Sequence, residues 1–81
     1  MIRLIDLARD AGRDAQTAVE KAVALRCDFH LRDPQDGSIR PCTPLTAAQA
    51  IAGTLGGYEP EAVELGSRSA AQVLAALSAP A

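Results

Sequence analysis

Cys27, His30 and Cys42 are residue types that could carry chemistry, because thiolates and imidazoles bind metals and act as nucleophiles or bases. A structural zinc site needs four ligands, usually with paired Cys-x₂₋₄-Cys spacing, and only Asp28 or Asp33 is at hand to complete the set. Residues 27 and 30 also fall on opposite faces of a strand. The sequence therefore predicts no metal site and no cofactor, and the two thiols are expected to be reduced and half-buried.

The carboxylates do not form a catalytic pair. Asp6, Asp10 and Asp14 alternate with Arg9 and Arg13, which is the pattern of a solvated helix face with i,i+4 pairing. The stretch GTLGGYEP lacks the lysine and the strand-to-helix setting of a phosphate-binding loop. The chain is therefore not expected to be an enzyme.

The N-terminal segment predicts two short helices. Leu4 and Leu7 recur at helical spacing, and Gly12 ends the first helix as a C′ glycine would. Asp14 is a suitable N-cap for a second helix over residues 14–25. The two helices are thus expected to pivot on Gly12.

Residues 4–22 resemble the helix-turn-helix of the lactose-repressor family headpiece. The matching positions are Leu4, Asp6, Ala8, Ala11, Gly12, Gln16 and Thr17. The resemblance implies that Ala8 lets the helices cross closely and that Gln16 and Thr17 begin a recognition helix. Glutamine pairs bidentately with adenine, and threonine contacts a phosphate or a thymine methyl. Glu20 and Lys21 depart from the family, which has a basic and an apolar residue there.

The resemblance and the basic residues around it define a candidate DNA contact set. Gln16 and Thr17 would face bases, whereas Arg9, Arg13 and Lys21 would face phosphates.

The opening LAxxxG is also similar to the small helical domain at the start of bacterial translation initiation factor two. That second resemblance implies RNA or protein contacts.

The middle of the chain predicts a β-hairpin, with 27–33 paired to 38–43 around DPQDG. The hydrophobic alternation places Leu31 opposite Ile39 and puts Cys27 and Cys42 on different faces. Arg32 and Arg40, near the tip, would reach a phosphate if the hairpin served as a wing. Ordinary solvated charge on an edge strand is the alternative reading of both.

Two or three helices are expected after the hairpin. The third helix has a capping-box pattern at Thr46 and is expected to end at Gly56–Gly57, and one turn follows Pro60. A last helix is expected to begin near Ser69. Its apolar stripe consists of Val73, Leu74 and Leu77. These side chains are expected either to cover the domain's own core or to form a protein interface.

Composition and charge limit the partners. Of 81 residues, 48% are hydrophobic, but seventeen are alanine, so the core is thin and self-association into a homodimer is expected. The formal net charge is −2, carried by residues 44–81, whereas residues 1–43 are neutral. No apolar run approaches the roughly 18 residues of a membrane span, and a cytoplasmic protein with no membrane partner is expected.

The sequence as a whole predicts a mainly α single domain with one β-hairpin, of helix-turn-helix or winged-helix-like type. Residues 1–26 form the helix pair, 27–43 the hairpin and 44–81 the C-terminal helices. The expected function is a small DNA-binding transcriptional regulator whose partner is double-stranded DNA. The alternative is a phage- or plasmid-type adaptor or inhibitor that docks on a host protein, which the acidity favours.

Overall fold

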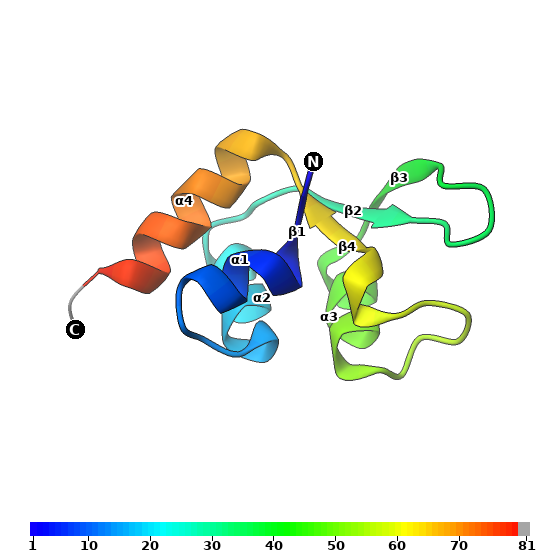
Figure 1. Cartoon of the computed structure of the whole chain (residues 1–81), viewed down its shortest axis with the longest axis horizontal. Coiled ribbons are helices and arrows are strands. Elements are labelled where there is room, and N and C mark those ends of the chain that lie inside the picture. Colours follow the sequence, from blue (N-terminus) through cyan, green and yellow to red (C-terminus); the bar gives the residue numbers. More distant parts are fainter. Residues whose placement is uncertain (80–81) are drawn as a thin grey trace.

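The computed structural model describes residues 1–79, in which short strands are interspersed among short helices (Figure 1). In chain order the elements are β1 (Ile2–Arg3), α1 (Leu4–Asp10), α2 (Ala15–Ala24), β2 (Phe29–Arg32), β3 (Ile39–Cys42), α3 (Pro44–Ala52), the 3₁₀ turn η1 (Pro60–Ala62), β4 (Val63–Leu65) and α4 (Ser67–Ser78).

The strands form one antiparallel sheet in the order β1-β4-β2-β3. The expectation of a mainly α fold is therefore corrected to a mixed α/β fold within a small single domain. The predicted hairpin is present as β2 and β3, and the turn after Pro60 is present as η1. The two other strands, β1 and β4, were missed because two or three residues are too few to display an alternating pattern.

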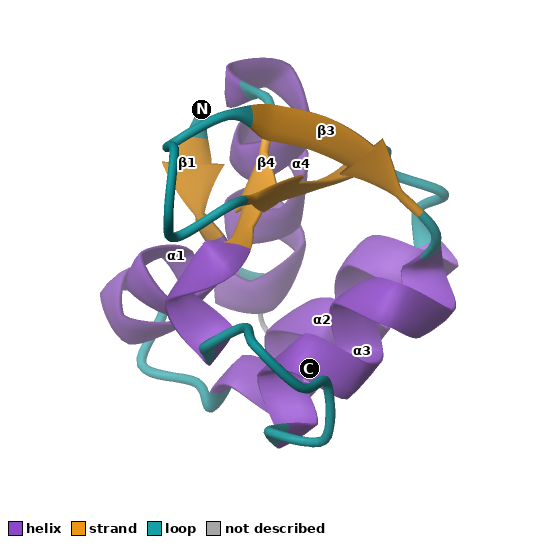
Figure 2. Ribbon diagram, turned by 90° about the vertical axis from the view of Figure 1, so that its right-hand side faces the viewer, coloured by secondary structure: helices purple, strands orange, loops and turns teal. Residues whose placement is uncertain are grey.

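The sheet has a core side and an outer side. Phe29 pairs with Leu65 and Cys42, so these three residues share the core side, which α1, α2 and α3 cover (Figure 2). All four α-helices contribute buried residues to this core. Its largest fully buried side chains are Phe29, Leu4, Leu65, Val19, Val63 and Val73.

The hairpin register differs by one residue from the prediction. Leu31 lies opposite Arg40 rather than Ile39, and Phe29 lies opposite Cys42. Cys42 therefore turns toward the core and packs against the cluster that includes Cys27, so the predicted separation of the cysteines onto different faces is wrong. A buried Phe29 sets the register more strongly than the exposed Ile39 does.

β3 is an edge strand, as its prolines indicated. The Asp33 N–H donates to the Ser38 carbonyl over 2.8 Å, so Pro41 falls at an alternate position whose N–H would point away from β2. The pairing of β2 with β3 therefore loses no hydrogen bond at Pro41. Because proline has no N–H, the outer edge of β3 lacks one donor that a further strand would need.

The predicted helix ends are partly corrected. α3 begins one turn earlier than expected, with Thr43 as N-cap, and ends at Gly53 instead of Gly56–Gly57, because Gly53 adopts the left-handed conformation (φ 78°). α4 begins at Ser67, directly after β4, instead of near Ser69. Thr46 and Ser69 lie inside the first turn of their helices, where a polar residue resembles an N-cap in sequence. This explains why both helices begin earlier than expected.

Asp14 is the N-cap of α2 as predicted, because its carboxylate accepts a 2.7 Å hydrogen bond from the Thr17 N–H. That bond lowers the pKa of Asp14 below its ordinary value of 3.8. The stabilisation is therefore complete above pH 3.8 and is lost as the pH falls through the lowered pKa. We expect the wild type to lose its stability advantage over Asp14→Asn as the pH falls from about 3.8 through the lowered pKa, as measured by urea unfolding of both proteins. An advantage that does not change with pH would contradict the assigned bond.

Candidate functional site

The helix pair α1–α2 is joined by a tight four-residue turn. Gly12 has φ 68°, and its N–H donates to the Arg9 carbonyl while the Arg13 N–H donates to the Ala8 carbonyl. These two bonds form a Schellman motif, which satisfies the last carbonyls of α1 and reverses the chain. Asp14 then starts α2, so the predicted pivot at Gly12 is confirmed.

α2 has a buried face made of small residues. Ala18, Val19 and Ala22 are at most 1% exposed, and α2 contacts α1, α3 and α4. Two of these three side chains are a single methyl group, so the neighbouring helices can approach closely. The rest of α2 stays on the surface.

The opposite side of α2 is what we call the open face, defined by the exposed residues Gln16, Glu20, Val23 and Ala24. These positions recur at intervals of three and four, so they form one stripe along the helix. Its N-terminal half carries the amide and the carboxylate, and its C-terminal half is apolar.

The structure brings five of the predicted DNA contacts to the helix pair. Arg13 is exposed in the turn before α2 and Gln16 is exposed in its first turn, whereas Thr17 and Lys21 are half-buried at the margin of the open face. Arg9 is exposed in the last turn of α1 and lies 3.5 Å from Asp6, which is also paired with Arg3. Thr17 donates its backbone N–H to the Asp14 carboxylate, and its side chain also contributes to lowering the pKa of Asp14.

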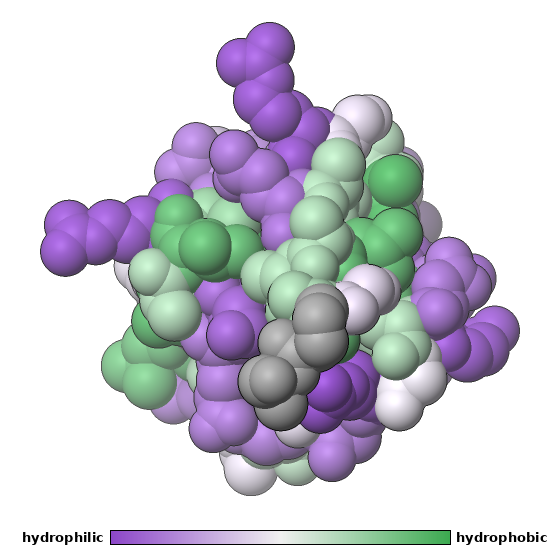
Figure 3. Space-filling model, turned by 90° about the vertical axis from the view of Figure 1, so that its left-hand side faces the viewer, coloured by the Kyte–Doolittle hydropathy of each residue, from purple (hydrophilic) through white to green (hydrophobic). Residues whose placement is uncertain are grey.

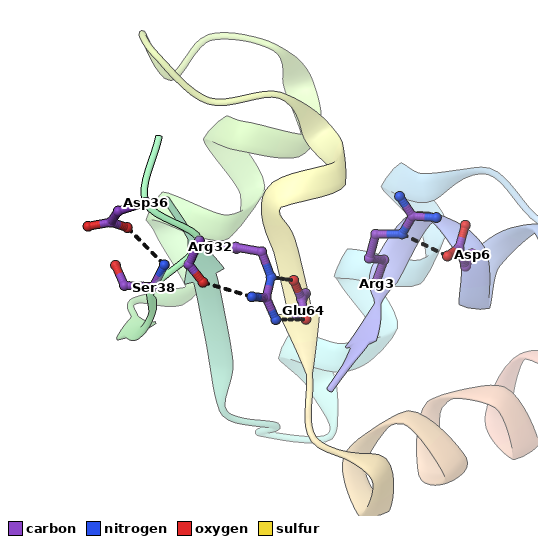
Figure 4. A network of polar contacts seen from close by, with 7 residues as sticks. Arg3, Asp6, Arg32, Asp36, Ser38 and Glu64 are labelled. Atoms are coloured by element: carbon purple, nitrogen blue, oxygen red, sulfur yellow. Dashed lines mark hydrogen bonds and ion pairs between the residues drawn. The ribbon is translucent and has the colours of Figure 1, made fainter. Parts of the chain in front are cut away.

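Arg32 lies elsewhere, on the outer side of the sheet (Figure 4). Its guanidinium donates to both carboxylate oxygens of Glu64, over 2.5 and 3.2 Å, and to the Gly37 carbonyl over 2.8 Å. Glu64 is only 4% exposed, and its hydrogen bond raises the pKa of Arg32. This side chain is thus held in a bidentate internal pair. Of the two arginines predicted on the hairpin, only Arg40 lies outside the ion pairs formed within residues 1–79.

The Arg32–Glu64 pair lies in a groove that sequence reasoning missed. The groove has a volume of about 460 Å³ and is lined by Arg3, Arg32, Pro34, Glu59, Glu61, Ala62 and Glu64. It forms where β4 runs between β1 and β2, so its residues come from three separate parts of the chain. In the sequence, the only sign of β4 is the glutamate between two apolar residues in VEL. A pattern of three residues does not distinguish a strand from a loop.

The predicted interface stripe on α4 belongs mainly to the chain's own core. Val73 and Leu77 are buried, and only Leu74 of the three is partly accessible. The first two are therefore not free to contact another chain. On the side of the molecule that faces left in Figure 1, hydrophobic areas lie between hydrophilic side chains that project outward (Figure 3).

The chemistry-bearing residues of the hairpin are kept apart. Cys27 is buried and Cys42 half-buried on the core side, both as free thiols, whereas His30 pairs with Glu64 and Pro41 on the outer side. Burial raises the pKa of the Cys42 thiol, which makes it a weaker nucleophile at neutral pH. Within residues 1–79, no three His, Cys, Asp or Glu side chains come together as a metal site would require.

In the described part of the chain, none of the helices has the length and apolar character needed to cross a membrane. No protein-family model, curated protein or solved structure matches the chain.

Proposed function

We propose that this chain is a small DNA-binding regulator of helix-turn-helix type, and that the open face of α2 enters the major groove. The observation that carries the proposal is the exposure of Gln16 and Arg13 at the start of a helix that follows a tight turn. A recognition helix contacts base edges through its N-terminal residues, and its partner helix crosses the backbone. The lengths of α1 and α2 and the four-residue turn suit that arrangement.

The distribution of charge supports the same surface. Residues 9–26, which include α2 and the end of α1, carry four basic and three acidic side chains, and one of the acids, Asp14, is engaged in the cap. The acidic excess of the chain, at Glu59 and Glu61, lines the groove on the outer side of the sheet. A duplex bound to the open face of α2 would therefore not face these two carboxylates.

Selection from a library of random duplexes at low salt tests the proposal. We expect enrichment of a short sequence and a band shift that weakens as salt is raised, because phosphate contacts release counterions. Failure to bind any duplex at low salt would overturn the proposal.

Lys21 is proposed as a phosphate contact at the margin of the open face. Lys21→Ala is expected to weaken binding to all sequences alike and to reduce the slope of log K against log salt by about one. Fluorescence anisotropy over a salt series measures both quantities. Arg68→Ala, which removes an exposed charge from α4 outside the helix pair, is the matched control and should leave the slope unchanged. An equal change in the two variants would contradict the assignment.

Docking on a partner protein is a second candidate, and exposed apolar side chains favour it. Val23 and Leu25 at the end of α2 are 43% and 42% exposed, and Leu45 at the start of α3 is 68% exposed. A nuclease-treated pull-down from a host lysate distinguishes the two functions. Capture that survives nuclease and is lost in Leu45→Ser would favour the protein partner, whereas capture lost on nuclease treatment favours DNA.

A further inference from the structure

We infer that Glu20 is a second base-reading residue and that it selects cytosine, an inference that rests on the proposed DNA binding. Glu20 is exposed on the open face four residues after Gln16, so both side chains project from the same stripe of α2. A ligand that lies along the open face and contacts Gln16 therefore also lies close to Glu20.

The carboxylate of Glu20 is not used to hold the fold. The ion pairs among residues 1–79 join Asp6 to Arg3 and Arg9 and join Arg32 to Glu64, and the Asp14 carboxylate caps α2. Glu20 takes part in none of these contacts. Its hydrogen-bonding capacity is therefore available to a ligand.

An ionised carboxylate only accepts hydrogen bonds, so it requires a donor on the base edge. Cytosine presents its N4 amino group in the major groove, whereas guanine presents acceptors at N7 and O6 and thymine presents an acceptor at O4. Adenine offers a donor but places the N7 acceptor beside it. Glu20 therefore favours cytosine and disfavours the acceptor-rich bases, while Gln16 is suited to adenine.

The helix geometry also sets the spacing between the two bases. Four residues of α-helix rise about 6 Å, and successive base pairs are about 3.4 Å apart. If α2 lies along the groove, Gln16 and Glu20 contact base pairs no more than two steps apart. The enriched site is expected to contain adenine and cytosine at that fixed spacing.

Duplex selection with the wild-type chain, Glu20→Gln and Glu61→Gln tests the inference. The control removes a carboxylate from the outer groove, away from α2. We expect the wild type and Glu61→Gln to enrich the same site, and Glu20→Gln to lose about tenfold of its preference for cytosine at one position. Circular dichroism should show all three chains folded alike, because both glutamates are exposed.

The outcomes separate this inference from the proposed function. Binding with an unchanged cytosine preference in Glu20→Gln would overturn the assignment of Glu20 alone. A variant that binds every sequence more tightly by the same factor would also overturn it, because Glu20 would then act only by repelling phosphates. If no duplex is bound by any of the three chains at low salt, the proposed function fails and this inference fails with it.

Discussion

Replacement of Phe29 with alanine is expected to leave a large fraction of the chain unfolded at 25 °C. Phe29 is 1% exposed, is the only phenylalanine, and lies at the junction where β2 pairs with both β3 and β4. Truncating a buried phenylalanine costs about 3–5 kcal/mol. A single core in a domain of this size contributes only about 3–5 kcal/mol in total. The substitution therefore removes most of the free energy of unfolding.

Urea unfolding followed by circular dichroism measures this effect. Leu45→Ala is the matched control, because Leu45 is a large apolar residue that is mostly exposed, and such surface changes stay within about 0.5 kcal/mol. A loss in Phe29→Ala below about 1 kcal/mol would mean that the site collapses around the cavity and that the core does not depend on this side chain.

Gln16→Ala is expected to have the largest effect on sequence discrimination without changing the fold. Gln16 is exposed on α2 and makes no contact that the helix requires, and alanine is the better helix former. A bidentate pair with a base contributes about 1–3 kcal/mol of discrimination. The variant should therefore bind the enriched site more weakly and lose its preference for adenine at one position.

Competition binding with the enriched site and its single-base variants measures that preference. Gln72→Ala makes the same change at an exposed position of α4 and is expected to leave discrimination intact. If Gln16→Ala weakened all sequences equally, Gln16 would be a phosphate contact and not a base contact. An unchanged affinity would remove it from the interface.

The helix pair could be predicted from sequence because its determinants are local. Gly12 supplies the left-handed residue that ends α1, and Asp14 supplies the cap that starts α2, each within one turn of the residues it serves. Exposure of Gln16 followed from the same register, since Ala18 and Val19 must turn inward. Local signals of this kind do not depend on the rest of the fold.

The sheet and the outer groove could not be predicted because their determinants are separated in sequence. β1 and β4 pair across most of the chain, and neither is long enough to display a period of two. Glu64 and Arg32 are thirty-two residues apart, and no pattern within either segment indicates that they meet. From the sequence, Arg32 therefore resembles a free charge near the hairpin tip, and only the structure shows that it pairs with Glu64.

An amide NMR titration with a duplex enriched by selection tests the central claim, that the open face of α2 is the DNA-binding surface. The expected result is that the largest shift changes fall on residues 13–24 and continue into the end of α1, while residues 59–65 in the outer groove stay unchanged. Changes concentrated on residues 59–65, or no change with any duplex at low salt, would contradict it.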